Sequence, residues 1–259
     1  MTKLEIKDKY IYVLNSEGDY GNGYLKIIDI SDSMNPDIIS SISVSASNTM
    51  AFMNNYLYLA GGGEIETYDI SNKSNPILKS TYNGRLNQYK DITIVGHFMY
   101  ASTGGYNKLE ILTLLIPDRP TRGSVLSLPE SVENIAVSGD YLYMVAPNKG
   151  LLTVDASDLL KPKLIHTLKT LSYVRDIDVK GDFAYLAEEG EGMSIVNVKD
   201  PVNPILVSFI DIPNKINAID VDENYAYLIG WDKMYIIDIS DNRNPIKVSE
   251  FTFAIKGTG

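Results

Sequence analysis

Hydrophobic residues along the chain alternate with polar ones or come in short β-branched runs, and this pattern is typical of strands rather than helices. The most regular stretch is LKIIDISDSMNP, residues 25–36, in which an apolar strand pattern leads into a polar turn and a proline. Similar stretches cover residues 65–76, 109–120, 151–162, 193–204 and 234–245. Their closing prolines are 40, 44, 42, 42 and 41 residues apart, so the chain is predicted to contain six structural repeats.

A second landmark precedes each of these stretches, an aromatic residue followed two positions later by Tyr. The six steps are residues 10–12, 56–58, 98–100, 141–143, 183–185 and 225–227. The two rings of a step share one face of a strand because side chains alternate. A shorter apolar alternation comes before each step, separated from it by polar turn residues such as Gly181 and Asp182.

Each repeat therefore predicts four strands; in the fifth repeat we expect them near residues 176–179, 183–187, 193–198 and 205–210. Four-stranded meanders repeated every 40–45 residues are the signature of a β-propeller. The predicted fold is an all-β, six-bladed β-propeller in which each blade is a four-stranded antiparallel meander. It forms a single domain, 1–259, with blades at approximately 2–48, 49–89, 90–132, 133–174, 175–216 and 217–259.

The units LKIIDIS, LLTVDAS, MSIVNVK and MYIIDIS, each followed by Asn-Pro or Lys-Pro, resemble the LVIVD repeat over essentially the whole chain. The resemblance implies a propeller of the kind often found in bacterial or archaeal surface and secreted proteins, and it carries no agreed catalytic residues. The third repeat departs most, with Thr113, Leu115 and Ile116 in place of the polar residues of the other copies. We expect the turn of that blade to be looser or covered by a neighbour.

The composition narrows the possible partners. The 259 residues include no cysteine and carry a net charge of −10, with the acidic residues spread along the chain. This disfavours nucleic acid, which needs a concentrated basic face. The given sequence begins with no basic-then-apolar leader and has no apolar run of about 18 residues, so membrane insertion is not expected. We expect a monomer without a cofactor, extracellular or at the cell surface by the resemblance, with the cytoplasm as the alternative.

In a meander the connections between strands 2 and 3 and between strands 4 and 1 lie on one side, and here they vary from repeat to repeat. Binding residues tend to lie on variable loops held by a rigid scaffold. The expected function is non-catalytic binding, or a scaffold role, with a carbohydrate or protein ligand recognised by these loops near the mouth of the channel. The candidate contact residues are Trp231, Tyr106, Tyr20, Arg85, Glu188, Glu189 and Glu191. Trp231 leads because it is the only tryptophan.

The recurring side chains are interpreted as structural. Asp29, Asp69, Asp155 and Asp238 are expected to accept backbone N–H bonds at the turn that ends in proline, rather than to bind Ca²⁺. The second aromatic residue of each step is always Tyr, and we expect these hydroxyls to bond backbone or a neighbouring blade.

Three alternatives remain open. A glycoside hydrolase or lyase would need a pair of carboxylates, for which Asp91 and Asp176, at the start of the first strand of their blades, are the candidates. Ca²⁺ could lie in the insertion of the first repeat at Glu17, Asp19 and Asn22, although the spacing of a twelve-residue calcium loop is missing. The chain could also be a structural spacer in a larger cell-surface protein.

Overall fold

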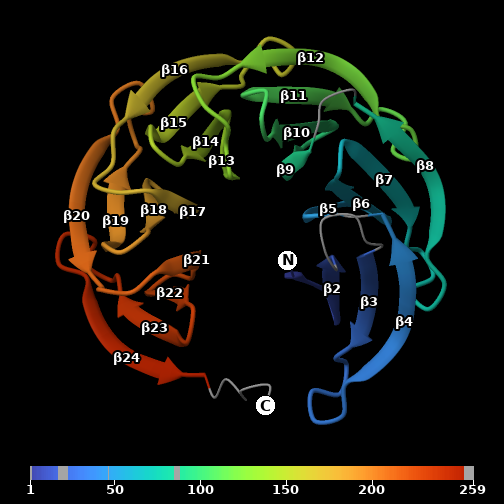
Figure 1. Ribbon diagram of the computed structural model, residues 1–259, viewed down its shortest axis with the longest axis horizontal. Coiled ribbons are helices and arrows are strands. Elements are labelled where there is room, and N and C mark those ends of the chain that lie inside the picture. Colours follow the sequence, from blue (N-terminus) through green and yellow to red (C-terminus); the bar gives the residue numbers. More distant parts are fainter. Residues whose placement is uncertain (1, 17–22, 46, 85–87, 254–259) are drawn as a thin grey trace. The chain divides into compact units, whose positions relative to one another are not determined.

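The six repeats fold into six four-stranded antiparallel sheets, as the alternation of apolar and polar residues predicted (Figure 1). The computed structural model describes residues 2–16, 23–45, 47–84 and 88–253. Each sheet contains four consecutive strands, so no strand of the described residues is exchanged between sheets. The protein is an all-β, six-bladed β-propeller with one antiparallel meander in each blade. The described residues contain no helix long and apolar enough to cross a membrane.

The blades belong to two compact units, Met1–Ser127 and Leu128–Gly259. The first unit holds three blades, whose strands are β1 (Thr2–Lys7), β2 (Tyr10–Ser16), β3 (Gly23–Asp29) and β4 (Asp37–Val44); β5 (Thr49–Met53), β6 (Tyr56–Gly61), β7 (Glu64–Asp69) and β8 (Ile77–Asn83); and β9 (Tyr89–Val95), β10 (Phe98–Thr103), β11 (Lys108–Thr113) and β12 (Thr121–Ser127).

The second unit holds the other three blades, whose strands are β13 (Asn134–Ser138), β14 (Tyr141–Ala146), β15 (Gly150–Asp155) and β16 (Lys163–Leu168); β17 (Val174–Lys180), β18 (Phe183–Glu188), β19 (Gly192–Asn197) and β20 (Ile205–Asp211); and β21 (Ile216–Val221), β22 (Tyr225–Gly230), β23 (Lys233–Asp238) and β24 (Ile246–Thr252). In the fifth repeat the observed strands agree with the predicted ones to within two residues at each end.

The repeated aspartates brace the turn between strands 3 and 4, as predicted. The Oδ1 atom of Asp29 accepts the backbone N–H of Ser31 at 2.8 Å, and Asp69, Asp155 and Asp238 each accept from the serine two residues on at 2.9 Å. The serine hydrogen bonds lower the pKa of these carboxyls. In the third repeat Thr113 takes this place, and its bond from the Leu115 N–H is longer, 3.4 Å, so the turn is looser there.

Backbone hydrogen bonds divide the connections of each unit into two sets. In every blade the corner after strand 3 donates to the turn between strands 1 and 2, as in Val198 N–H to the Asp182 carbonyl at 2.8 Å. The loop between strands 2 and 3 instead meets the segment between strands 4 and 1, as in Ile212 N–H to the Glu191 carbonyl at 3.1 Å. We call the first set the corner side and the second the variable side; their separation is the one predicted.

The aromatic steps pack between neighbouring blades. Tyr185 belongs to a buried cluster that joins β18 and β19 to residues of β21–β23. Its hydroxyl donates to Asn242 Oδ1 in the corner of the next blade at 2.8 Å, and Tyr58 and Tyr143 reach the next corners at the Pro117 and Val198 carbonyls. These three bonds are the predicted ones.

Tyr227 and Tyr12 behave differently from the expectation. Tyr227 donates to Asp222 of its own blade at 2.7 Å. The hydroxyl of Tyr12 is buried and has no hydrogen-bond partner among the described residues, although its ring makes an edge contact with Phe52 at 4.7 Å. Burial raises the pKa of Tyr12 to about 12.

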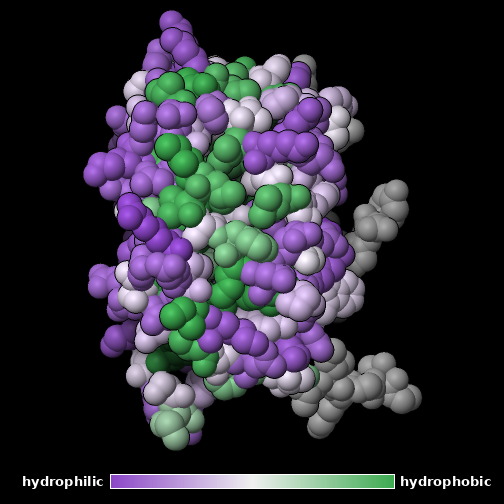
Figure 2. Space-filling view, turned by 90° about the vertical axis from the view of Figure 1, so that its left-hand side faces the viewer, coloured by the Kyte–Doolittle hydropathy of each residue, from purple (hydrophilic) through white to green (hydrophobic). Residues whose placement is uncertain are grey.

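The outer strands are irregular in the same way in all six blades. Each strand 3–strand 4 ladder has a register shift just before its corner residue, which is the last residue of strand 3 (Asp29, Asp69, Thr113, Asp155, Asn197 or Asp238). In the second blade the shift lies between Thr67 and Tyr68. The outer strand β20 exposes Ile205, Leu206 and Phe209. Figure 2 shows patches of hydrophobic side chains among hydrophilic ones on this side of the molecule.

Candidate functional site

The variable side of the second unit brings together residues from three connections. The N–H of Glu189 donates to the Tyr173 carbonyl at 2.8 Å, and Glu189 also forms an isolated β-bridge with Lys215. The segment before β17, the turn between β18 and β19, and the segment before β21 are therefore held side by side. All three belong to the variable connections in which the sequence predicts the ligand contacts.

Glu189 is the electrostatic centre of this region. Its Oε2 accepts from Arg175 Nε at 2.8 Å and Nη2 at 2.5 Å, and its Oε1 lies 2.5 Å from Lys215 Nζ. The hydrogen bonds from Lys215 and Arg175 lower the pKa of the Glu189 carboxyl. One carboxylate thus orients two cationic side chains that are each about a third exposed.

Each of these cations lies against an aromatic ring. The Arg175 guanidinium is 4.6 Å from the centre of the Tyr173 ring, and Lys215 Nζ is 5.8 Å from the Trp231 ring. Trp231 itself is 69% exposed. We call Tyr173, Arg175, Glu189, Lys215 and Trp231 the Trp231 cluster; it alternates aromatic and charged side chains along the variable side.

Glu188 is not available for contact. It is fully buried at the end of β18, where it accepts the Ser172 N–H at 2.6 Å and the Ser194 hydroxyl. Burial raises the pKa of the Glu188 carboxyl. The choice of Glu188 as a candidate contact residue is therefore wrong; its carboxylate instead holds the loop before β17 in place. Glu191 is exposed, and its backbone carbonyl accepts from Ile212.

The other contact candidates lie in the first unit. Tyr106 is 48% exposed in the turn between β10 and β11. Tyr20 and Arg85 lie outside the described residues, as do the calcium candidates Glu17, Asp19 and Asn22. Within the described residues no group of three or more His, Asp or Glu side chains is arranged to hold a metal ion.

The two carboxylates considered for catalysis join neighbouring blades. Asp91 accepts from Thr49 Oγ1 at 2.8 Å. Asp176 accepts from Asn134 Nδ2 at 2.5 Å and from the backbone N–H of Ile219 at 2.9 Å, so it links three blades of the second unit. Through these hydrogen bonds, both carboxylates connect the first strand of their own blade to the first strand of a neighbouring blade.

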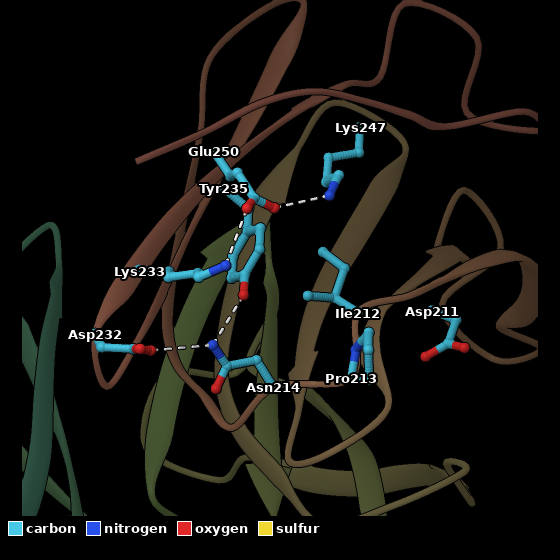
Figure 3. Close-up of a pocket in the computed structure, with 9 residues that line it drawn as sticks. All are labelled: Asp211, Ile212, Pro213, Asn214, Asp232, Lys233, Tyr235, Lys247 and Glu250. Atoms are coloured by element: carbon cyan, nitrogen blue, oxygen red, sulfur yellow. Dashed lines mark hydrogen bonds and ion pairs between the residues drawn. The ribbon is translucent and has the colours of Figure 1, made fainter. Parts of the chain in front are cut away.

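A cavity that the sequence did not indicate lies beside the Trp231 cluster (Figure 3). Its volume is about 480 Å³. Its lining comes from the segment between β20 and β21, the turn between β22 and β23, and strands β23 and β24: Asp211, Ile212, Pro213, Asn214, Asp232, Lys233, Tyr235, Lys247 and Glu250. We call it the Tyr235 cavity. Asn214 and Asp232 directly adjoin Lys215 and Trp231 in the chain, so the cluster and the cavity share two loops.

Hydrogen bonds fix the walls of the Tyr235 cavity. Asn214 Nδ2 donates to the Tyr235 hydroxyl at 2.8 Å. Glu250 accepts from Lys233 at 2.9 Å and from Lys247 at 2.8 Å, and these two bonds lower the pKa of its carboxyl to about 2.

Comparison with known proteins agrees with this architecture. The sequence matches the LVIVD repeat model over residues 2–44, 47–84, 130–170, 172–211 and 215–252. The unmatched part contains the third repeat, whose corner is the divergent one. No curated protein matches the sequence.

Solved structures similar to the chain include a protein from Lactobacillus plantarum, with a TM-score of 0.86 and 13% identity over 96% of this chain and 84% of that one. The periplasmic gluconolactonase PpgL of Pseudomonas aeruginosa has a TM-score of 0.84 and 10% identity over 97% and 85% of the two chains. The WD40 domain of Toxoplasma gondii coronin has a TM-score of 0.69 and 14% identity over 97% and 70%. At these identities the likeness shows the fold alone.

Proposed function

This chain belongs to the LVIVD repeat family, and we propose that it is a non-catalytic binding protein that recognises a carbohydrate or a protein through its variable side. The observation that carries the proposal is the Trp231 cluster. An indole that is 69% exposed lies beside Lys215, which Glu189 holds in place. An exposed aromatic side chain supported by fixed charges is the usual anchor of a recognition surface.

The repeated residues support a binding role for the variable side, because their own side chains are used in structural contacts. The corner aspartates use their carboxylates to close turns, and the buried aromatic steps join blades. Asp91 and Asp176 have structural hydrogen-bond partners, which argues against their use as a catalytic pair. The similarity to a gluconolactonase, at 10% identity, extends to the fold alone.

The compartment and the oligomeric state are part of the proposal. We place the protein outside the cell or at the cell surface, because LVIVD repeats are common in surface and secreted proteins. We further propose that it is a monomer. The net charge of −10 argues against nucleic acid as the partner.

The test is a combined glycan and peptide array probed with the labelled protein. We expect binding that Trp231→Ala reduces at least tenfold, since a central aromatic anchor contributes about 2 kcal/mol or more. Val202→Ala is the matched control, because Val202 is 61% exposed but lies on the corner side. Binding that Trp231→Ala leaves unchanged would refute the proposal. A chain that binds nothing on the array would instead be a spacer.

A further inference from the structure

The Tyr235 cavity lies beside a position that varies between blades. The residue three before the corner residue (Asp29, Asp69, Thr113, Asp155, Asn197 or Asp238) is Lys26, Glu66, Glu110, Leu152, Ser194 or Tyr235, respectively. Glu66 accepts the Ser45 N–H at 3.1 Å, and Glu110 accepts the Tyr89 hydroxyl at 2.5 Å, so each carboxylate binds the segment next to the variable side directly.

In blade six the same position is Tyr235, whose hydroxyl accepts from the Asn214 side chain of the preceding segment. The cavity beside it has a volume of about 480 Å³, which is within the range of small-ligand sites, roughly 300–1,000 Å³. It is bounded by side chains that have fixed positions, which makes it a preformed cavity.

The charges of the cavity favour a neutral ligand. Both lysines, Lys233 and Lys247, are bound to Glu250. Asp211 and Asp232 add two more carboxylates, which disfavour an anion. The two ammonium groups offset two of the three carboxylates and leave the lining a net charge of −1, so an anion is repelled and a cation is attracted only weakly.

The shape and hydrogen-bonding groups favour a hydroxylated ring. Figure 3 shows the Tyr235 ring on one side of the cavity and Ile212 with Pro213 on the other, which gives two apolar walls. Between them the Tyr235 hydroxyl accepts from Asn214 and keeps its own proton for donation, while Asp232 and Asp211 offer acceptors. A pyranose presents apolar C–H faces and a rim of hydroxyls, which matches this arrangement.

We propose that the Tyr235 cavity binds one ring of a neutral saccharide, with Trp231 at its rim contacting the rest of the chain. The inference rests on the proposed function, because the cavity shares its two loops with the Trp231 cluster. It goes further by choosing the saccharide over the protein ligand and by naming the residues that hold the ring.

The experiment is a titration of the ¹⁵N-labelled full chain, followed by NMR. The probes are glucose, galactose and N-acetylglucosamine at millimolar concentration, with glucuronate and the tripeptide Gly-Lys-Gly as charged comparisons. The reporter is the Asn214 side-chain amide, assigned from its loss in Asn214→Asp. We expect at least one neutral sugar to shift this signal, and Tyr235→Phe to weaken the binding about five- to tenfold through loss of one hydrogen bond. Tyr225→Phe, the same change on β22 of the same blade, should leave the affinity unchanged.

Three results would overturn the inference: no neutral sugar moves the Asn214 amide, a charged probe binds more tightly, or Tyr235→Phe has no effect. The proposed function fails separately. If Trp231→Ala abolishes array binding while the sugars leave Asn214 untouched, only the saccharide assignment is wrong. If array binding does not depend on Trp231, the proposed function is wrong whatever the sugars do.

Discussion

Tyr58 and Tyr12 differ in their hydrogen bonding, and this difference alone should decide whether replacement by Phe lowers or raises the stability of the fold. Both rings are fully buried at the same position of neighbouring blades. Tyr58 donates to the Pro117 carbonyl at 2.8 Å, whereas the Tyr12 hydroxyl has no partner among the described residues. Replacing either by Phe removes one oxygen and keeps the ring contacts.

The expected magnitudes follow from these two environments. Tyr58→Phe loses a hydrogen bond and should destabilise the fold by about 1 kcal/mol. Tyr12→Phe removes a buried hydroxyl whose unpaired state costs about 1–3 kcal/mol, so it should be neutral or stabilising by about 1 kcal/mol. For a chain of this size each kcal/mol moves Tm by about 2–4 °C. The two variants should therefore differ in Tm by roughly 2–8 °C.

Differential scanning calorimetry and urea unfolding of the two variants beside the parent chain measure this difference. The dependence of unfolding free energy on urea should stay the same in all three, because the buried surface is unchanged. Equal destabilisation by both substitutions would show that Tyr12 also has a bonding partner and that the reasoning is wrong.

Three further predictions concern the site and its support. Gly192→Ala should lower the free energy of unfolding in urea by more than about 1 kcal/mol, because a Cβ at φ +112° would lie 2.3 Å from a backbone oxygen of the facing strand. Gly190→Ala, at φ +83° with open space around it, should lower the free energy of unfolding by less, and equal losses would contradict the role of the contact. The Glu250 carboxyl should titrate near pH 2 by ¹³C NMR, below its ordinary pKa of 4.5, and Lys233→Met should raise that midpoint. The contribution of Glu250 to stability is present above pH 4.5 and is lost as the pH falls through about 2. Glu110→Gln should lower the free energy of unfolding by about 2 kcal/mol, because it removes the buried carboxylate that Tyr82, Tyr89 and Arg122 share. An unchanged urea midpoint would contradict this expectation.

The fold was predictable because every level of the sequence repeats. The alternation and the polar turns occur six times and the corner aspartate four times, so an error in one copy is corrected by the others. Even the divergence of Thr113 appears as a longer hydrogen bond. The partners of the tyrosine hydroxyls were less predictable, because Tyr12 and Tyr227 occupy the same sequence position as Tyr58 but meet different neighbours.

The site could be predicted only in part. Variability marked the loops that form the Trp231 cluster, and the structure holds Glu189, Lys215 and Trp231 together. Glu188 was misassigned because β18 extends one residue further than expected, and this strand is buried on both faces from Ala184 to Glu188. The Tyr235 cavity was not predictable, because the residue three before the corner residue differs in almost every blade: Lys26, Glu66, Glu110, Leu152, Ser194 and Tyr235.

The central claim, that the variable side of the second unit binds the ligand, is tested most directly by the fluorescence of Trp231, the only tryptophan in the chain. Quenching by acrylamide is measured with and without the strongest ligand from the array. Because Trp231 is 69% exposed, we expect strong quenching of the free protein, and a blue shift with protection from acrylamide when ligand is bound. Unchanged emission and quenching at a ligand concentration that saturates binding would contradict the central claim.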